Sequence, residues 1–415
     1  MKLPRPQRDS GWLGAPPTAE ISAQEAAPID AALIDAASQN PFIRYRKLLW
    51  SYHKARERGW DDDDFSGLVL RLDEAVQEVD GRGFSVTPFD SHPALAAEAG
   101  AEQLWVKNET VNVGSSHKAR HLFGLALHLE IDEVPKSQPL AIASCGNAAL
   151  GAAIVAKATG RPLEVFAPTS IESEIYSELD RLEAQVNLCK RQRGETGDPA
   201  FLRFKEALAD GAIAFSVQGP ENIWTLDGGR ILGWELAESF ANADHEFFSW
   251  VFVQVGGGAL ASCIVQGMQE ARDFKMFNYL PRVCAVQTYG CAPLARAINL
   301  IQEKVMESNP EEALIHAISH PEEYMWPWEK EPRSIAGGIL DDETYDWLPI
   351  AWGIIESGGD TPVVSDKQIR KALKLAHTHT DIPAGPTGIS GLAGLLKVAE
   401  SQNITNAAVL FTGIT

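Results

Sequence analysis

The sequence predicts an α/β fold with two lobes, each a mostly parallel twisted sheet flanked by helices. From about residue 83 onward, short β-rich runs alternate with helix-length stretches, which is typical of parallel strands joined by crossover helices. Eight such runs are too many for one small sheet, and 415 residues exceed one ordinary core. The predicted strands are QLWVK, PLAIA, LEVFA, QVNL, AIAFSV, SWVFVQV, RVCAVQ and AAVLFT.

The segment before this alternation predicts an arm followed by two helices. Residues 1–40 are rich in Pro, Ala and Ser and show no period, so we expect a loosely attached arm. Helical spacing of apolar residues begins after Asn40. The acidic run from Asp61 to Asp64 predicts the start of a second helix that continues through Val79, because carboxylates there complement the helix dipole.

Between the strands, the predicted helices span 118–130, 147–159, 171–184, 199–210 and 259–274. Residues 303–362 are rich in Trp, interrupt the alternation and predict an irregular insertion. Ser365 and Gln368 have the spacing of a capping box, which predicts that a helix begins there. The expected domains are an N-terminal arm with helices (1–85), a large lobe (86–135 and 220–415) and a small lobe (136–219).

Composition and charge exclude several classes of protein. Lys and Arg number 36 and Asp and Glu 56, a formal net charge of −20, so we expect no nucleic-acid partner. No apolar stretch of about 18 residues and no secretory signal occur, so we expect no membrane association. The five scattered Cys predict reduced thiols in the cytoplasm. His316 and His320 lack the Glu of the zinc-protease motif, so we expect no metal site.

Four strand-to-helix junctions carry the candidate chemistry, because ligands of open α/β sheets bind at the carboxyl ends of strands. The first is VKNETVNVGSSHKAR, in which Lys118 follows a Gly-Ser-Ser turn at a predicted helix start. The helix dipole is expected to lower the pKa of this lysine, and a neutral amine can form a Schiff base or abstract a proton. A surface lysine on the first turn of a helix is the alternative interpretation.

The second and the fourth junctions offer backbone N–H groups and a hydroxyl, respectively, as groups that can bind a ligand. In ASCGNAALG, Gly146 allows a tight turn, Asn147 is suited to cap the next helix, and the backbone N–H groups can hold a carboxylate. In AAVLFTGIT, the hydroxyl of Thr412 follows a buried strand and can bind a ligand. A capped helix and an ordinary strand end are the alternatives.

The third junction, VQVGGGALA, predicts a phosphate site. Three successive Gly between a strand and a helix leave backbone N–H groups free to surround a phosphate. The spacing Gly256-x-Gly258-x-x-Ala261 also fits the loose dinucleotide fingerprint, which requires an acidic residue about twenty positions later. Gln287 and Thr288 end the next strand instead, so we expect phosphate binding without a nicotinamide cofactor.

Taken in order, these junctions resemble those of pyridoxal-phosphate enzymes of fold type II, the tryptophan synthase β-like superfamily. The resemblance runs from about Thr87 to the C-terminus and is strongest to threonine synthases and serine/threonine dehydratases. It implies pyridoxal 5′-phosphate as cofactor, bound to the large lobe in a cleft between the lobes, and a homodimer. The segments that carry it are TPF, LWVKNETVNVGSSHKAR, SCGNAALGAAIVAKATG, TLDGGRILGWEL and the glycine loop.

The resemblance also implies a role for each candidate residue. Lys118 would carry the cofactor and handle the α-proton of the substrate, Asn147 would bond the pyridine 3′-oxygen, and Thr412 would face the pyridine nitrogen. The implied substrate-binding residues are Ser116, Ser144, Cys145 and Gly146, and the implied phosphate-binding residues are Gly256, Gly257, Gly258 and Ala259.

The motifs mix features of several activities within the family. His117 before the lysine resembles tryptophan synthase β, GGGAL resembles the dehydratases, and Thr412 resembles threonine synthases. We expect a pyridoxal-phosphate-dependent lyase that deaminates a small hydroxy amino acid by β-elimination, as serine/threonine dehydratases do. A threonine synthase acting on O-phosphohomoserine, a β-replacement synthase and a non-catalytic ligand-binding homologue remain the alternatives.

Overall fold

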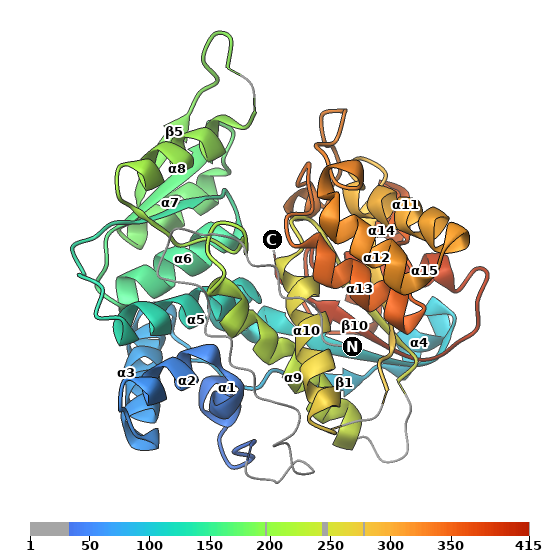
Figure 1. Cartoon of the computed structure of the whole chain (residues 1–415), viewed down its shortest axis with the longest axis horizontal. Helices are drawn as coiled ribbons and strands as arrows, with labels where there is room; N and C mark the ends of the chain where they lie inside the picture. The colour runs from blue at the N-terminus through green and yellow to red at the C-terminus, as the bar shows by residue number, and fades with distance from the viewer. Residues whose placement is uncertain (1–32, 196, 243–247, 277–278, 415) are drawn as a thin grey trace. The chain divides into compact units, whose positions relative to one another are not determined.

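The computed structural model describes residues 33–195, 197–242, 248–276 and 279–414, which pack into two compact units (Figure 1). Unit 1 consists of the described residues of Met1–Ser85 and Lys118–Gly229. Unit 2 consists of those of Val86–His117 and Arg230–Thr415. Most of the predicted N-terminal arm lies outside the described residues.

Unit 1 is built on a parallel sheet with the strand order β5-β4-β3-β6. Leu140, Ala141 and Ile142 of β3 are all fully buried, as expected for a parallel strand that is covered on both faces. The strands are β3 (Leu140–Ala143), β4 (Leu163–Pro168), β5 (Gln185–Cys189) and β6 (Ile213–Ala214). The helices that alternate with them are α5 (Lys118–Ile131), α6 (Asn147–Ala158), α7 (Ser173–Arg181) and α8 (Pro199–Ala209).

The first helices of the chain, α1 (Pro41–Arg44), α2 (Trp50–Glu57) and α3 (Asp62–Asp80), also pack within unit 1. The predicted acidic helix start is confirmed, since Asp61 and Asp64 form a capping box at the start of α3. The buried carboxylate of Asp227 accepts hydrogen bonds from the backbone N–H groups of Trp50 (2.8 Å) and Ser51 (2.9 Å). A carboxylate at the first turn of α2 satisfies donors that have no partner inside the helix.

The two units divide the chain differently from the lobes expected from the sequence. Residues 118–135 and 220–229 were expected in the large lobe, whereas they belong to unit 1 together with the helices of residues 41–80. The packing of α5 and of α3 against α6 accounts for this grouping. This grouping by contacts does not test the lobes, so their predicted boundaries stay a prediction.

In the described part of the chain, unit 2 is built on a six-stranded sheet with the order β1-β2-β10-β7-β8-β9. β1 is antiparallel to β2, and the other neighbours are parallel. The strands are β1 (Phe89–Ser91), β2 (Ala101–Asn108), β7 (Trp250–Gln254), β8 (Arg282–Thr288), β9 (Val363–Val364) and β10 (Ile404–Phe411). The other elements are α4 (Pro93–Ala99), α9 (Thr225–Asn242), which begins in unit 1, α10 (Ala259–Asp273), α11 (Pro293–Glu307), α14 (Asp366–His379) and α15 (Ser390–Val398).

The expected irregular insertion at 303–362 is wrong in part. Within it the structure has α12 (Pro310–Ser319) and α13 (Trp347–Ser357), and α11 extends into it as far as Glu307. The apolar face of α13, which includes the buried Trp347 and Ile350, packs against α10 and β8. Trp347, one of the Trp on which the predicted irregular insertion depended, is therefore a core residue of a regular helix.

A close crossing between α5 and the start of α9 requires Gly. A Cβ atom on Gly228 would lie 2.0 Å from the carbonyl oxygen of Arg120, and one on Gly124 would lie 2.5 Å from the backbone nitrogen of Gly228. Neither helix backbone can yield without disturbing the core of unit 1. The TLDGGRILGWEL segment therefore includes a Gly that helix packing demands.

Gly228→Ala is expected to lower the free energy of unfolding by about 2–3 kcal/mol through overpacking. Gly67→Ala on α3 is the matched control, because the nearest atom to its new Cβ is Arg71 Nη1 at 3.9 Å. That control is expected to leave stability unchanged or to raise it by up to about 1 kcal/mol, the helix-propensity gain. Urea unfolding of both variants measures the difference, and equal midpoints would contradict the crossing.

Candidate active site

In unit 1, two helix N-termini bring together the predicted lysine and the predicted Asn loop. α5 begins at Lys118, as expected, and α6 begins at Asn147. A Cβ on Gly151, one turn into α6, would lie 3.3 Å from the backbone nitrogen of Ala119. The beginnings of these helices are therefore in contact, and Lys118, the first residue of α5, is half-buried.

The loop before α6 differs from the prediction in its cap. Gly146 is the N-cap residue and no side chain provides a capping hydrogen bond, so the expected capping by Asn147 is wrong. Asn147 occupies the first helical position instead. Ser144 is half-buried, and its Oγ lies 3.5 Å from the backbone nitrogen of Gly146, while Cys145 is exposed. Its position at a helix N-terminus gives this loop the backbone donors that attract an anion.

The turn before Lys118 belongs to unit 2 and is conformationally strained. Gly114 (φ +63°) and Ser115 (φ +52°) are both left-handed, which is uncommon for Ser. Buried Glu109 holds the turn, since it accepts hydrogen bonds from Thr87 Oγ1 (2.5 Å) and Asn112 Nδ2 (3.1 Å). Asn112 Nδ2 also donates to the carbonyl oxygen of Ser116 (3.2 Å). This set of bonds fixes the backbone immediately before the lysine.

A buried ion pair supports the same turn. Lys107 Nζ lies 2.6 Å from Glu235 Oε2 and donates to the carbonyl oxygen of Thr87 (2.7 Å). Lys107, Glu109 and Glu235 are all buried. Breaking one partner of a buried pair is costly, so the pair ties α9 firmly to the end of β2.

Thr412 lies beside the lysine segment in unit 2. Its carbonyl oxygen accepts a hydrogen bond from the backbone N–H of His117 (3.1 Å), and Ser116 pairs with Gly413 as an antiparallel bridge. Its hydroxyl accepts a hydrogen bond from Gln254 Nε2 (2.6 Å), whose other hydrogen bond goes to the carbonyl oxygen of Gly388 (2.7 Å). Because Gln254 donates to it, the Thr412 hydroxyl keeps its own hydrogen to donate to a ligand.

The glycine loop of unit 2 joins β7 to α10 and already holds an anionic group. Asp341 Oδ2 accepts a hydrogen bond from the backbone N–H of Gly257 (2.7 Å). Gly258 is the N-cap of α10 and is left-handed (φ +99°). Cβ atoms on Gly256, Gly257 and Gly258 would lie 2.4, 2.9 and 2.8 Å from atoms of Asp341, Tyr345 and Thr344, respectively. The loop therefore has to be glycine, and its donors suit an anion.

One turn after Lys118, His121 is held neutral. Burial lowers the pKa of His121 to about 3, and the positive charge of Lys118 contributes to the shift. Its Nδ1 lies 3.0 Å from the carbonyl oxygen of Thr225 and therefore carries the ring hydrogen. Burial likewise lowers the pKa of His128, whose Nε2 lies 3.0 Å from Asp227 Oδ2. Unit 1 thus folds around two uncharged imidazoles.

These two His predict acid sensitivity. The unfolded chain binds a proton at each His below about pH 6.5, whereas folded His121 does so only near pH 3. The stability that neutral His121 contributes is complete above about pH 6.5 and falls by about 1.4 kcal/mol per pH unit below it. The free energy of unfolding, measured with urea, is therefore expected to be lower at about pH 5 than at about pH 7.5. His121→Asn is expected to reduce this difference between the two pH values. His379→Asn on α14 should keep the wild-type difference, and equal behaviour of the two variants would contradict the assignment.

Comparison with known proteins identifies the family. The model of the family described as pyridoxal-phosphate dependent enzymes matches residues 82–413. The chain belongs to this family. It is a pyridoxal-phosphate-dependent enzyme with the tryptophan synthase β-like fold. None of the helices in the described part of this enzyme combines the length and apolarity that a membrane crossing requires.

Relatives of the enzyme carry two different activities in their names. A threonine synthase of Methanosarcina acetivorans is 23% identical and covers 76% of this chain and 70% of its own. A biosynthetic L-threonine dehydratase of Haemophilus influenzae is 23% identical over 84% of this chain, which spans 59% of that relative. Among solved structures, maize serine racemase (TM-score 0.62, 18% identical, 83% of this chain and 92% of that one) and a threonine deaminase of Solanum lycopersicum (0.60, 17%, 86% and 91%) share the fold.

The residues of the enzyme fit pyridoxal phosphate. The N–H of Gly257 already binds a carboxylate, so the glycine loop can donate to an anionic oxygen such as that of a phosphate. The Thr412 hydroxyl can donate to an unprotonated ring nitrogen. The cofactor, when bound, supplies the electron sink that makes the substrate α-proton removable.

Sequence reasoning missed the residues that position this site. Gln254 orients the hydroxyl of Thr412, and its signal was an amide side chain at the end of an otherwise apolar strand. Glu109 and Asn112 hold the lysine turn, although both lie inside the quoted lysine segment. Asp341 comes from the segment that was expected to be irregular, and no local pattern connected it with the glycine loop.

Proposed function

We propose that this enzyme deaminates a small hydroxy amino acid by β-elimination, as serine/threonine dehydratases do. The hydrogen bond from Gln254 to Thr412 supports elimination or replacement, and the choice of a dehydratase rests on the resemblance of GGGAL to the dehydratases. A hydroxyl that can donate to a neutral ring nitrogen leaves that nitrogen unprotonated, and the family resemblance associates this arrangement with elimination and replacement rather than transamination. An Asp at this position would instead favour protonation.

In this proposal the residues of the chain divide the work. Lys118 holds the cofactor and moves the α-proton of the substrate. Backbone N–H groups of 144–146 hold the substrate carboxylate at the start of α6, with Ser116 nearby in sequence to Lys118, and Asn147 orients the cofactor ring. The loop from Gly256 to Ala259 binds the phosphate at the start of α10. We also propose that the enzyme works in the cytoplasm as a homodimer.

Threonine synthase chemistry on O-phosphohomoserine is the second candidate, supported by the threonine synthases among the relatives. Product analysis separates the two. We expect the purified enzyme with pyridoxal phosphate to release ammonia from threonine or serine, and to release no inorganic phosphate from O-phosphohomoserine. Phosphate release from O-phosphohomoserine would favour the synthase, and β-replacement would require a second nucleophile for any product to form.

A further inference from the structure

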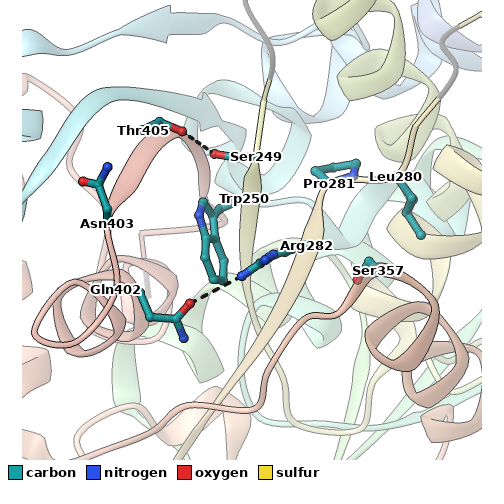
Figure 2. A pocket seen from close by; sticks show the side chains of 9 residues that line it. All are labelled: Ser249, Trp250, Leu280, Pro281, Arg282, Ser357, Gln402, Asn403 and Thr405. Atoms are coloured by element: carbon teal, nitrogen blue, oxygen red, sulfur yellow. Dashed lines mark hydrogen bonds between the residues drawn. The ribbon is translucent and has the colours of Figure 1, made fainter.

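A cavity of about 640 Å³ opens in unit 2 at the amino-terminal ends of β7, β8 and β10 (Figure 2). The groups that face it and enter the argument are Ser249, Trp250, Arg282, Gln402, Asn403 and Thr405. These three strands are parallel, and the glycine loop and Thr412 follow the carboxyl ends of β7 and β10. At about 3.3 Å per residue, the five residues of β7 separate the cavity from the glycine loop by roughly 16 Å. The cavity is therefore distinct from the proposed cofactor site.

Two hydrogen-bond donors face the cavity, one from Trp250 and one from the exposed side chain of Arg282. Trp250 is only 4% exposed, yet its indole N–H has no acceptor among the residues that the structure describes. The guanidinium of Arg282 lies over that indole, 4.9 Å from the ring centre, and its one polar contact in the described chain is with Gln402 Oε1 at 3.5 Å. The indole N–H itself is reachable from the cavity, so water or a ligand there can accept its hydrogen.

The charge of the cavity indicates the sign of its ligand. Arg282 forms no ion pair with a carboxylate of the described residues, although Asp and Glu outnumber Lys and Arg by 56 to 36. A carboxylate does contact another residue that lines the cavity, since Glu102 accepts a hydrogen bond from Asn403 Nδ2 (3.3 Å). The hydroxyls add no free donor, because Ser249 donates to the carbonyl oxygen of Asn406 (2.9 Å) and Thr405 therefore donates to Ser249 (2.9 Å; Figure 2). Among the described residues that line the cavity, Arg282 alone carries a formal charge, and that charge is positive.

We propose that this cavity binds a small organic carboxylate, with Arg282 and the indole N–H of Trp250 as its donors. A guanidinium fork matches the two oxygens of a carboxylate, and the indole N–H adds a directional donor beside it. A single cation suits a monoanion better than a phosphate dianion, which favours several charges or a row of backbone N–H groups. The proposal does not depend on the reaction assigned to the enzyme.

The indole N–H resonance of Trp250 tests the proposal directly. In the ¹⁵N-labelled enzyme loaded with pyridoxal phosphate, Trp250→Phe identifies this resonance among those of the 11 Trp. Acetate and pyruvate are titrated separately, and each is expected to shift the resonance saturably. Arg282→Gln is expected to weaken the affinity at least tenfold. Arg370→Gln, which removes an exposed Arg from α14, should leave the affinity unchanged.

The possible outcomes decide between carboxylate binding and its alternatives. A linear, unsaturated shift, or the same shift in Arg282→Gln, would overturn the proposal by showing that the anion acts non-specifically. Tighter binding of inorganic phosphate than of either carboxylate would overturn the ligand class. Repeating the titration in Lys118→Ala excludes a signal relayed from cofactor chemistry, so the saturable shift should persist there. A saturable shift in Lys118→Ala would support carboxylate binding even if the proposed elimination reaction proved incorrect.

Discussion

Lys118→Ala is expected to abolish turnover and the visible absorbance of the enzyme when it is supplied with pyridoxal phosphate. In the proposed mechanism the amine of Lys118 is both the covalent attachment point of the cofactor and the group that moves the α-proton, so the substitution would remove both. Loss of a positioned acid–base group alone reduces rates by about 10²–10⁴-fold, so the combined loss should exceed that range. The absorbance spectrum and the rate of ammonia release from threonine or serine measure the two effects separately.

Lys118→Arg is the sharper control for this prediction. It keeps a positive charge at the first residue of α5, where Lys118 is half-buried, but a guanidinium stays protonated and forms no Schiff base. We expect it to fold normally and to lack the visible band. Lys157→Ala on α6, which removes an ion pair with Glu183 in the same unit, should keep both colour and activity. A Lys118→Arg enzyme with the wild-type spectrum would mean that another lysine holds the cofactor.

The regular elements of this fold were predictable because their signals are local. All eight predicted strands are present, and the five predicted interstrand helices end within three residues of their expected bounds. The short strands β1 and β9 were missed, since three and two residues alone carry no period, whereas the two-residue β6 lies inside a longer β-rich run. The capping box of Ser365 and Gln368 is confirmed for the same local reason.

What escaped prediction depends on contacts between distant residues. Gln254 meets Thr412 across 158 positions, and Asp341 meets Gly257 across 84. Asp227 binds the start of α2 across 177 positions, which draws the N-terminal helices into unit 1. No spacing rule detects such pairs. Motifs supplied the candidate residues of the site, which stay a prediction, while the groups that contact them became visible only in the structure.

The contact between Asp341 and the glycine loop leads to the second large prediction. A carboxylate on the N–H of Gly257 competes with any phosphate for the same donor, and its charge repels the phosphate. Asp341→Asn is therefore expected to strengthen the binding of inorganic phosphate to the cofactor-free enzyme about tenfold, or about 1.4 kcal/mol. Isothermal titration calorimetry with inorganic phosphate measures this affinity without any turnover.

Asp342→Asn separates the effect of this hydrogen bond from that of net charge. Asp342 carries the same charge one residue away, and its carboxylate contacts the Tyr345 hydroxyl (3.5 Å) rather than the glycine loop. A much smaller gain in Asp342→Asn than in Asp341→Asn would identify competition for the Gly257 donor. Weaker phosphate binding in Asp341→Asn would show the opposite role, in which the carboxylate holds the loop in its binding conformation. In the first case, cofactor binding must displace Asp341, so the segment that carries it would rearrange whenever the phosphate site fills.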